Sequence, residues 1–456
     1  MQWRLVKIIA TLGPASASRG TVEGMIGAGV DAFRINMSHG DEALWSMMLN
    51  LIRDAERSYG KRLGLIADLE GPRVRLGNFN PIRVEKGDIV EVSLGNEEGI
   101  TIDNPAFFET IDVGDRVLID DGKVTLQVES VSGYKAKLRV IEGNLIEPRK
   151  GVAVSGKEFD VPPVTDKDRR DLEFVAKNGF SHVMVSYARD EAHIETVREI
   201  LDKLGGRGVK VLAKIETPQG VRRARELAKA SDGVVIARGD LGMHYPLEEI
   251  PVIQSLIIEA ARSEYKPVIL ATELLSSMVD KPIPTRSEVV DVYEGVRAGV
   301  DALLLTSETA IGKYPLEVVK WCNRIIRRAQ SKLSLSRPRA DTLEYRLAHG
   351  IVELVESLDA KLVIYSQTGT FPVRISAFRP RMTYYAGVPS DSIERALRIV
   401  WGVEPMSVGS ESYEEGLAKA SREAKKRGYL GIGDVVVEAA WEKKGDTYIV
   451  KIRRLT

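Results

Sequence analysis

Polar side chains spaced two apart within an apolar run are the first sign of chemistry in this sequence. The run AFRINMS, at 32–38, carries Arg34, Asn36 and Ser38. Successive side chains of an extended strand alternate between its two faces, so these three would share one face. Burying a charge without a partner is costly. We therefore expect this face to meet an oppositely charged group or a polar ligand.

The ends of the other apolar runs are polar as well. Their residues are Asp68, then Lys214 and Glu216, Arg238 and Asp240, Thr272 and Glu273, and Ser307 with Glu308. Any one of these side chains could simply cap a loop. As a set, they predict a shared polar rim at one end of a group of strands.

The residue types at these ends favour phosphoryl transfer. Glu216 and Asp240 offer hard oxygen donors of the kind that Mg²⁺ or Mn²⁺ prefers. Arg34 and Lys214 suit a phosphate group. The sequence has no GxxxxGK[ST] loop, no GxGxxG segment after a strand and no Cys/His spacing typical of zinc. Two carboxylates and two cations at one rim predict metal-assisted chemistry on a phosphorylated substrate.

A regular alternation of strand-like and helix-like segments must position these side chains. Short apolar runs beginning near residues 7, 32, 62, 182, 209, 233, 266 and 301 alternate with segments of helical period. Continuous apolar strands separated by amphipathic helices predict a parallel sheet. Eight such units predict a closed (β/α)8 TIM barrel with its site at the C-terminal ends of the strands. An open, doubly wound sheet is the alternative.

Two segments depart from this alternation. Between about 72 and 164, period-two runs punctuated by Gly-Asp, Asp-Gly and Ser-Gly pairs predict a small inserted β-barrel that acts as a hinged lid. After about 338, helices and strands predict a C-terminal α/β domain whose last two strands form a hairpin around EKKGD. We therefore expect a catalytic barrel at 1–71 and 165–337, a lid at 72–164 and a regulatory domain at 338–456.

The composition excludes several partners. Lys+Arg and Asp+Glu both number 65, so the formal net charge is zero and neither nucleic acid nor an anionic membrane is an expected partner. No segment approaches the roughly 18 apolar residues of a membrane span, and the N-terminus lacks a secretory signal pattern. The one cysteine, Cys322, lies in an apolar helical pattern and is interpreted as a core residue. These features predict a cytoplasmic protein.

Seven motifs closely resemble the signatures of the pyruvate kinase family. They are KIIATLGPAS, FRINMSHG, KGVAVSGKEFDVPPVTDKD, AKIETPQG, VVIARGDLGM, ILATELLSSM and KPIPTRSEVVDVYEGVRAGVDALLLTSETAIGKYP. The resemblance covers about residues 5–330, whereas the C-terminal segment is similar in layout and weaker in motif. It implies transfer of a phosphoryl group from phosphoenolpyruvate to ADP, giving pyruvate and ATP in the last step of glycolysis, by a homotetramer.

The resemblance also implies roles for residues of the rim. Arg34 would hold the transferring phosphoryl group, and Lys214 would stabilise its charge and that of the developing enolate. Glu216 and Asp240 would ligate the divalent metal, which bridges phosphate and enolate oxygens. The backbone amides of Gly239 and Asp240, at the start of a helix, would receive the substrate carboxylate.

Three further positions follow from the same resemblance. Thr272 would lie near the carbon that is protonated, although the proton donor itself is not assigned. Arg75 and Lys150 match positions that bind the nucleotide phosphates at the two linkers of the lid.

One departure from the family pattern concerns potassium. Members that need K⁺ bind it through positions matching Asn36, Ser38, Asp68 and the backbone of Leu69. The family segment DTKGPEIR reads DLEGPRVR here, so Arg73 replaces the acidic residue that accompanies K⁺ dependence. A fixed guanidinium could supply the positive charge that the ion otherwise provides. We therefore expect activity that does not require K⁺.

A second site is expected in the C-terminal segment. In SQTGTFP, Ser366, Thr368, Gly369 and Thr370 could cradle a phosphate with hydroxyl groups and backbone amides. The segment resembles the sugar-phosphate effector loop of regulated family members, although Phe371 replaces a hydroxyl residue. A plain helix N-cap is the alternative.

Two other functions compete with phosphoryl transfer. A metal-dependent pyruvate or enolate lyase would use a similar pair of carboxylates on the same barrel, but it would need no nucleotide lid. An adhesion module would display the tripeptide Arg238–Asp240 on an exposed loop of a secreted protein, which this chain does not resemble.

Overall fold

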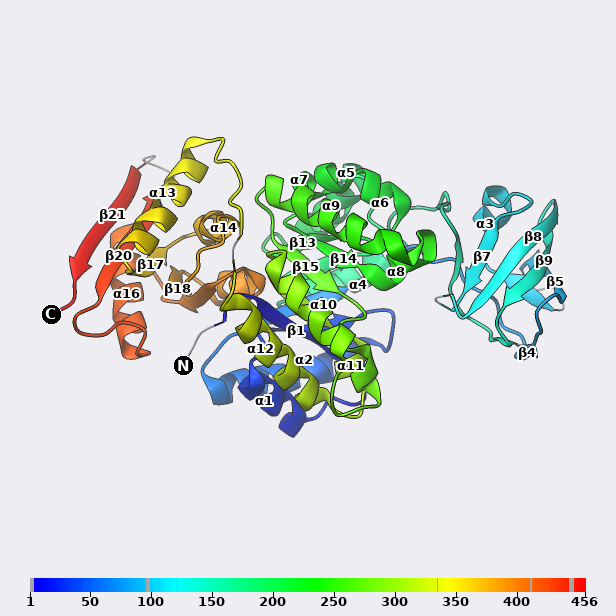
Figure 1. Cartoon of the computed structure of the whole chain (residues 1–456), viewed down its shortest axis with the longest axis horizontal. Helices are drawn as coiled ribbons and strands as arrows, with labels where there is room; N and C mark the ends of the chain where they lie inside the picture. The colour runs from blue at the N-terminus through cyan, green and yellow to red at the C-terminus, as the bar shows by residue number, and fades with distance from the viewer. Residues whose placement is uncertain (1–3, 96–98, 121, 334, 411, 443–446) are drawn as a thin grey trace.

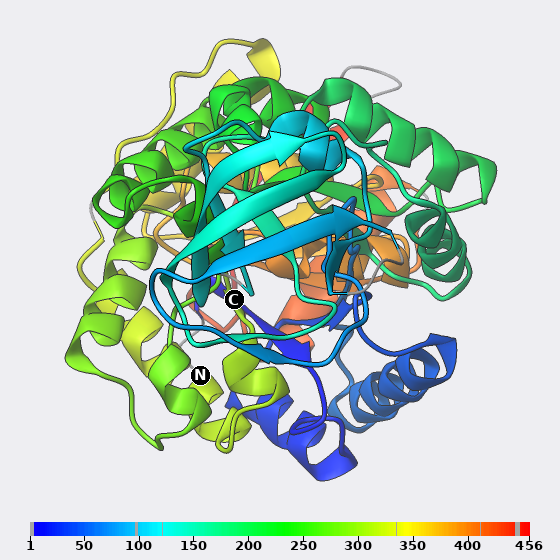
Figure 2. The same ribbon diagram turned by 90° about the vertical axis from the view of Figure 1, so that its right-hand side faces the viewer.

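The computed structural model contains a barrel with one smaller unit at each end (Figure 1). It describes residues 4–95, 99–120, 122–333, 335–410, 412–442 and 447–456. The C-terminal α/β unit lies at one end of the barrel, and the inserted β unit projects from the other end. Viewed along this axis, the inserted unit stands in front of the ring of barrel helices (Figure 2). None of the described helices is long and apolar enough to cross a membrane.

The predicted closed barrel is confirmed, and the open sheet is not. Its parallel strands are arranged in the order β1 (Lys7–Leu12), β16 (Ala302–Leu305), β15 (Val268–Ala271), β14 (Gly233–Ala237), β13 (Lys210–Ile215), β12 (His182–Val185), β3 (Gly64–Asp68) and β2 (Ala32–Asn36). The sheet closes because β1 pairs with both β16 and β2. Closure brings all the C-terminal strand ends to one rim.

Amphipathic helices surround these strands. They are α1 (Arg19–Ala28), α2 (Glu42–Tyr59), α4 (Asp166–Lys177), α5 (Glu191–Lys203), α6 (Pro218–Arg222), α7 (Ala224–Ala230), α8 (Arg238–His244), η1 (Leu247–Glu249), α9 (Ile250–Ser263), η2 (Ser276–Val279), α10 (Arg286–Arg297), α11 (Ser307–Ala310) and α12 (Pro315–Gln330). Capping boxes at Thr165 and Thr285 begin α4 and α10. Cys322 is fully buried in α12, and burial raises the pKa of its thiol to about 12, as expected of a core residue.

The inserted unit is built from short β-strands around its own apolar core. Its elements are β4 (Ile82–Arg83), β5 (Ile89–Leu94), β6 (Ile100–Ile102), α3 (Ala106–Thr110), β7 (Arg116–Ile119), β8 (Val124–Ser132), β9 (Lys135–Glu142), β10 (Leu145–Ile146) and β11 (Val152–Val154). The main sheet has the order β11-β7-β8-β9-β5-β6. The chain enters this unit after β3 and returns from it before α4, so two linkers join it to the barrel rim.

The C-terminal unit is a five-stranded sheet covered by helices. Its elements are α13 (Leu343–Ser357), β17 (Lys361–Tyr365), α14 (Thr370–Ala377), β18 (Tyr384–Val388), α15 (Asp391–Ala396), η3 (Leu397–Ile399), β19 (Val403–Ser407), α16 (Tyr413–Lys426), β20 (Val435–Glu442) and β21 (Thr447–Arg454). The strand order is β19-β18-β17-β20-β21. β20 and β21 pair antiparallel, as expected of the final hairpin. Residues 443–446, part of the EKKGD segment on which the hairpin was expected to be centred, lie outside the described residues.

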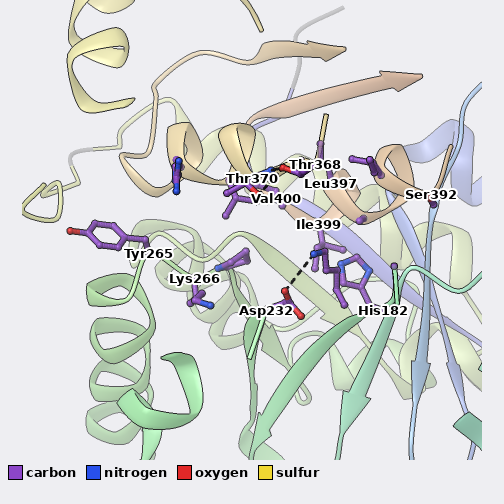
Figure 3. A pocket seen from close by; sticks show the side chains of 18 of the residues that line it. His182, Asp232, Tyr265, Lys266, Thr368, Thr370, Ser392, Leu397, Ile399 and Val400 are labelled. Carbon is purple, nitrogen blue, oxygen red and sulfur yellow. Dashed lines mark hydrogen bonds and ion pairs between the residues drawn. The ribbon is translucent and has the colours of Figure 1, made fainter. Parts of the chain in front are cut away.

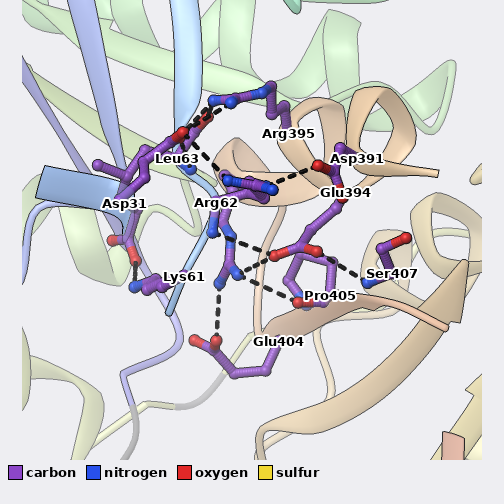
Figure 4. Close-up of polar contacts among 12 residues, drawn as sticks. Asp31, Lys61, Arg62, Leu63, Asp391, Glu394, Arg395, Glu404, Pro405 and Ser407 are labelled. Atoms are coloured by element: carbon purple, nitrogen blue, oxygen red, sulfur yellow. Dashed lines mark hydrogen bonds and ion pairs between the residues drawn. The ribbon is translucent and has the colours of Figure 1, made fainter. Parts of the chain in front are cut away.

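The base of the barrel packs directly on the C-terminal unit. Apolar residues inside the barrel and in the core of the C-terminal unit form one contiguous buried cluster. Ion pairs cross the same boundary, including Arg395 with Glu56 and Arg62 with Asp391 (Figure 4). Arg379 also reaches from the C-terminal unit to buried Asp301, at 2.6 Å. The two units therefore share a core and a polar network.

Candidate active site

Arg34 and Asp68 meet at the C-terminal ends of two neighbouring strands. The register of β2 and β3 places Asn36 opposite Asp68. Arg34 Nε donates to Asp68 Oδ2 at 2.7 Å, and Arg34 Nη1 donates to Thr11 Oγ1 at 3.0 Å. Burial acts to raise the pKa of Asp68, but the charges of Lys214 and Arg34 outweigh it and lower this pKa. Asp68 is therefore an anion that fixes the Arg34 guanidinium.

Lys214 lies at the centre of the rim. Its Nζ is 3.3 Å from Asp68 Oδ1 and 3.3 Å from Glu216 Oε2, and it donates to Ser186 Oγ at 2.9 Å. Burial acts to lower the pKa of Lys214, but the neighbouring carboxylates outweigh it and raise this pKa. The ammonium group is thus held charged, with its direction set by three partners. Ser186, which immediately follows β12, was not identified from the sequence.

Glu216 and Asp240 form the negative side of the rim. Glu216 is 1% exposed, and its Oε1 accepts the backbone amide of Tyr187 at 2.5 Å. Burial and the charge of Asp240 raise the pKa of Glu216 to about 7, although Lys214 opposes them. Two carboxylates that disfavour each other's charge fit a divalent cation, which would neutralise both.

The protein supplies only part of a metal coordination sphere at this rim. Among the described residues, no group of three or more His, Cys, Asp or Glu side chains is arranged to hold a metal ion. Hard cations that bind through one or two carboxylates complete their shell with water and substrate oxygens. Glu216 and Asp240 would supply such a pair of carboxylates.

Arg238 holds a strained turn beside these carboxylates. Thr272 and Glu273 follow β15 and have positive φ angles of 65° and 53°. This backbone conformation is unfavourable for residues other than glycine. Arg238 Nη2 donates to the carbonyl oxygens of Thr272 and Glu273, at 2.8 and 3.1 Å, and its Nη1 donates to Asp291 at 2.7 Å. Thr272 Oγ1 in turn accepts the amide of Gly239 at 2.8 Å. The sequence identified Arg238 at the rim, but not the turn that it holds.

Arg75 and Lys150 lie on the two linkers at the base of the inserted unit. Arg75 pairs with Gly151 in an isolated bridge, which brings the linkers side by side. The Arg75 guanidinium donates to Glu70, whereas Lys150 Nζ lies 3.2 Å from Asp120. Both side chains are about one-third exposed, at 30% and 33%, so a ligand entering between lid and rim can reach them.

The expected potassium positions are grouped at the ends of β2 and β3. Asn36 Oδ1 accepts the amide of Ser38 at 3.1 Å, and the carbonyl oxygen of Leu69 accepts the Ser186 hydroxyl at 2.7 Å. Asp68 faces Arg34 and Lys214, as described above. The oxygens of Asn36, Asp68 and Leu69 therefore already have protein partners.

Arg73 reaches from the first linker towards the rim. Its Nη2 lies 3.9 Å from Asp240 Oδ1. A Cβ atom at Gly151 would stand only 2.9 Å from Arg73 Nε, so the absence of a side chain at Gly151 makes room for the guanidinium. Arg73 also contributes positive charge at the Tyr187 ring. A third fixed cation thus stands at the carboxylate side of the rim.

Two residues of the expected polar rim, Glu308 and Glu273, are not part of its network of charges in the described structure. Glu308 is buried and accepts the backbone amides of Leu275, at 3.0 Å, and Thr306, at 2.8 Å. Glu273 is exposed. For Glu308, loop capping is what the structure shows.

The candidate effector loop lies at the opposite end of the barrel (Figure 1). Ser366 follows β17, and its Oγ accepts the amide of Gly369 at 3.1 Å. Gly369 precedes α14 with φ 79° and offers no side-chain cap. The Thr368 and Thr370 hydroxyl groups are 3.0 Å apart and exposed. The loop is thus separate from the rim and has hydroxyl groups open to a ligand.

Comparison with known proteins accounts for this arrangement. A family model described as pyruvate kinase, barrel domain, matches residues 3–319, and one described as pyruvate kinase, alpha/beta domain, matches residues 346–452. The chain is 54% identical over 454 residues to the pyruvate kinase of Aeropyrum pernix, with 99% of each chain covered. It is 36% identical over 421 residues to the pyruvate kinase of Pyrobaculum aerophilum, with 91% of each covered.

A solved structure of the same family has the same fold as this chain. The crystal structure of pyruvate kinase from Pyrobaculum aerophilum matches with a TM-score of 0.91 and 33% identity, covering 99% of this chain and 100% of that chain. The barrel, the inserted unit and the C-terminal unit are therefore all shared features. The chain belongs to the pyruvate kinase family, whose members are phosphotransferases that use phosphoenolpyruvate and ADP and generally need a divalent metal.

Proposed function

We propose that the barrel rim is where this pyruvate kinase transfers the phosphoryl group of phosphoenolpyruvate to ADP, and that Lys214 stabilises the charge that moves. The observation that carries this assignment is the position of Lys214 Nζ, 3.3 Å from both Asp68 and Glu216. A buried, oriented ammonium group stabilises developing negative charge far better than one free in water. Arg34, fixed by Asp68, would bind the phosphoryl oxygens.

The remaining rim residues complete the proposed binding of phosphoenolpyruvate. Glu216 and Asp240 would hold the divalent cation, which when bound withdraws charge from phosphoryl and enolate oxygens. The amide of Asp240, in the first turn of α8, would receive the substrate carboxylate, and the amide of Gly239 would join it by exchanging its hydrogen bond to Thr272 Oγ1. Thr272, whose hydroxyl already contacts Gly239, would lie beside the reacting carbon. Support for these roles comes from the shared rim and from family membership.

We assign the nucleotide phosphates to the two linkers of the lid. Arg75 and Lys150 are brought together there by the bridge between Arg75 and Gly151. The two cations would bind the phosphates of the nucleotide between rim and lid. The same division supports our proposed boundaries, with the barrel at 1–71 and 165–337, the lid at 72–164 and the C-terminal domain at 338–456.

We further propose that catalysis does not require K⁺. Asp68, Glu216 and Asp240 bring three negative charges to the rim, and Arg34, Lys214 and Arg73 bring three positive charges. The contacts that link them are Arg34–Asp68 at 2.5 Å, Lys214–Asp68 and Lys214–Glu216 at 3.3 Å, and Arg73–Asp240 at 3.9 Å. With Glu216 ionised, the fixed charges of the protein at the rim balance, and Arg73 supplies the positive charge that a monovalent cation would otherwise provide.

Regulation, assembly and location complete the proposal. The Ser366–Thr370 loop would receive the phosphate of an effector, for which its open hydroxyl groups and the α14 N-terminus are suited.

A homotetramer is supported by large apolar side chains exposed on the barrel, among them Leu247, Val252 and Val290. Substrates drawn from glycolysis support a cytoplasmic location.

Replacing Lys214 with methionine tests the central assignment. Lys214→Met keeps the side-chain volume and removes the charge, so turnover should fall by several orders of magnitude. Steady-state formation of ATP from phosphoenolpyruvate and ADP would be measured with Mg²⁺. Lys210→Met, at the other end of the same strand, is the matched control and should keep its unstimulated turnover. Near-normal turnover in Lys214→Met would contradict the role of Lys214.

A further inference from the structure

The segment through which the chain returns from the lid to the barrel, residues 155–165, is bound to both units; we call it the return linker. The lid projects from the barrel rim on two linkers (Figure 1), of which this is the second. The Phe159 ring packs on the apolar core of the lid, with its centroid 6.2 Å from that of Phe107. Val164, further along, belongs to the barrel core. A movement of the lid therefore displaces the return linker relative to the rim.

Glu158 of the return linker completes the first turn of a rim helix. Its Oε1 accepts the backbone amide of Gln219, the second residue of α6, at 2.5 Å. The first residue of α6 is a proline, which has no amide proton, and the third, Gly220, donates to Thr217 Oγ1 at 3.1 Å. Glu158 therefore satisfies the one free donor among the first three residues of α6. This helix begins directly after Glu216 and Thr217.

Arg189 holds the return linker from a second point of the rim. Its Nη1 donates to the carbonyl oxygen of Phe159 at 3.2 Å, and its Nη2 donates to that of Val161 at 2.5 Å. Arg189 lies two residues after Tyr187, whose amide binds Glu216 Oε1. Tyr187 has a positive φ angle of 54°, a backbone conformation that persists only where the surrounding structure supports it. The segment that orients Glu216 is thus bound directly to the return linker.

The two points at which the rim holds the return linker pack against each other. A Cβ atom at Gly220 would stand only 2.9 Å from the carbonyl oxygen of Ala188, so α6 approaches the loop after β12 more closely than a side chain would allow. Segments packed at this density transmit displacements to one another. Glu158 and Arg189 therefore act on one packed unit, which consists of residues 186–189 and the start of α6 and which surrounds Glu216.

The carboxylate of Glu158 also lies near the helix that bears Asp240. Burial raises the pKa of Tyr245, the residue after α8, and the negative charge of Glu158 adds to this increase, although Arg222 opposes it. Glu158 Oε2 is buried and accepts no hydrogen bond within the described part of the chain. A buried oxygen without a donor costs free energy. The position of this carboxylate is therefore better explained by a role in orienting the rim than by a gain in stability.

We propose that Glu158 and Arg189 are positioning residues that couple the lid to Glu216, so that the position of the lid sets the affinity of the rim for the divalent metal. The inference deepens the proposed function and rests on its assignment of the metal to Glu216 and Asp240. Nucleotide bound at the linkers would hold the return linker in place, and the linker would hold the segments that orient Glu216. By linkage, a metal bound at the rim would strengthen the contacts of the return linker by the same factor.

Binding of Mn²⁺ to the full-length protein, followed by the loss of the free-ion EPR signal, tests this coupling. In Glu158→Ala the Kd for Mn²⁺ should rise roughly tenfold, as when a group that orients a metal ligand is removed. Glu158→Gln keeps a carbonyl oxygen for the Gln219 amide and should restore most of the affinity. Lys157→Ala is the matched control and should not change the Kd, because Lys157 pairs with Asp112 and Asp115 inside the lid, both at 2.6 Å.

Amide hydrogen exchange measures the same coupling from the side of the lid. Saturating Mn²⁺ should slow exchange across residues 155–165 in the wild-type protein and in Lys157→Ala. In Glu158→Ala this protection should be largely lost, as it should in Arg189→Lys, since lysine keeps the charge but cannot donate to both linker carbonyl groups. The thermal midpoint of each variant would show that it remains folded.

Glu216→Gln separates this inference from the proposed function. If this variant binds Mn²⁺ as tightly as the wild-type protein, the metal assignment is wrong and the inference is overturned with it. If Glu216→Gln loses Mn²⁺ binding but Glu158→Ala and Arg189→Lys keep the wild-type Kd, the metal assignment stands and the coupling alone is overturned. Equal rises in the Kd in Glu158→Ala and Lys157→Ala would indicate a loosened lid without specific coupling and would also overturn it.

Discussion

At the scale of single residues, the clearest consequence comes from Arg73, which stands where K⁺-dependent family members have an acidic residue. Its guanidinium lies 3.9 Å from Asp240, beside the pair of carboxylates expected to hold the divalent metal. A positive charge fixed by covalent structure does not dissociate, whereas a bound monovalent cation depends on its concentration. The proposed independence from K⁺ therefore follows from one side chain and the glycine that makes room for it.

Reversing the charge of this residue should create a requirement for K⁺. In Arg73→Glu, the rim gains uncompensated negative charge, so turnover should be low without K⁺ and should rise many-fold on its addition. Arg73→Lys keeps the charge and should remain insensitive to K⁺. The measurement is a Mg²⁺-saturated assay with K⁺ exchanged for tetramethylammonium at constant ionic strength. A many-fold response of the wild-type protein to K⁺ would refute the hypothesis.

Arg238 acts at the same scale but through backbone carbonyl groups. It is 8% exposed and donates to both residues of the strained turn that presents Thr272. Lysine keeps the charge but cannot reach both carbonyls and Asp291 together. In Arg238→Lys we expect turnover to fall roughly 10- to 100-fold because Thr272 loses its exact placement.

The control for this prediction is Arg297→Lys, since Arg297 is exposed on α10 and pairs only with a helix neighbour in the described structure. Steady-state turnover and the KM for phosphoenolpyruvate would be measured for both variants. Unchanged kinetics in Arg238→Lys would show that the turn does not depend on this arginine.

At the scale of elements, the linkers of the lid should determine nucleotide affinity. Lys150 lies at the end of one linker and shares Asp120 with Lys123, which is 73% exposed. Lys150→Ala removes a charge-assisted contact worth about 1.5 to 3 kcal/mol, so the KM for ADP should rise roughly 10- to 100-fold.

Lys123→Ala is a matched control because it removes a lysine from the same carboxylate without approaching the rim. The KM for ADP should stay near the wild-type value in this variant, and the KM for phosphoenolpyruvate should change little in either. Equal effects of the two substitutions on the KM for ADP would argue against a specific role of Lys150.

At the scale of the whole molecule, buried charges lie at the end of the barrel that packs on the C-terminal domain. Burial acts to raise the pKa of Asp31, but the charges of Arg4, Lys61 and Lys7 outweigh it and hold this pKa well below its usual range. Asp31 also accepts the amide of Ile8 at 2.9 Å. Because the folded-state pKa is depressed, the carboxylate stabilises the fold above the unfolded-state pKa of about 4.

Neutralising Asp31 should therefore destabilise the protein in a manner that depends on pH. Asp31→Asn leaves the Arg4 guanidinium without its buried partner and should cost about 3 kcal/mol at pH 7. As pH falls below about 4 towards the depressed folded-state pKa, the wild-type protein loses the same stabilisation and the difference should narrow. Denaturant unfolding of both proteins at pH 7 and pH 3 measures this difference in the free energy of unfolding. A constant difference between the two pH values would exclude this ionic origin.

Local pattern was sufficient to predict the strands of the barrel. The eight strands were visible as β-branched apolar runs, and the helices as amphipathic segments, because burial on both faces of a parallel sheet leaves a continuous apolar signature. The grouping of Arg34, Lys214, Glu216 and Asp240 at one rim followed from strand direction, since the carboxyl ends of parallel strands in a barrel meet on one side. Their catalytic roles stay predictions.

Contacts between residues distant in the chain were decided only by the tertiary structure. The link from Arg238 to the turn at Thr272, the place of Arg73 beside Asp240, and the diversion of Glu308 to loop amides all depend on how separate elements pack. A cavity lined by Lys266 of the barrel and Thr370 of the C-terminal domain likewise combines segments more than 100 residues apart (Figure 3). The spacing of residues in the sequence predicts on which face of its own element a side chain lies. The position of its partner on another element depends on long-range packing, which local periodicity does not determine.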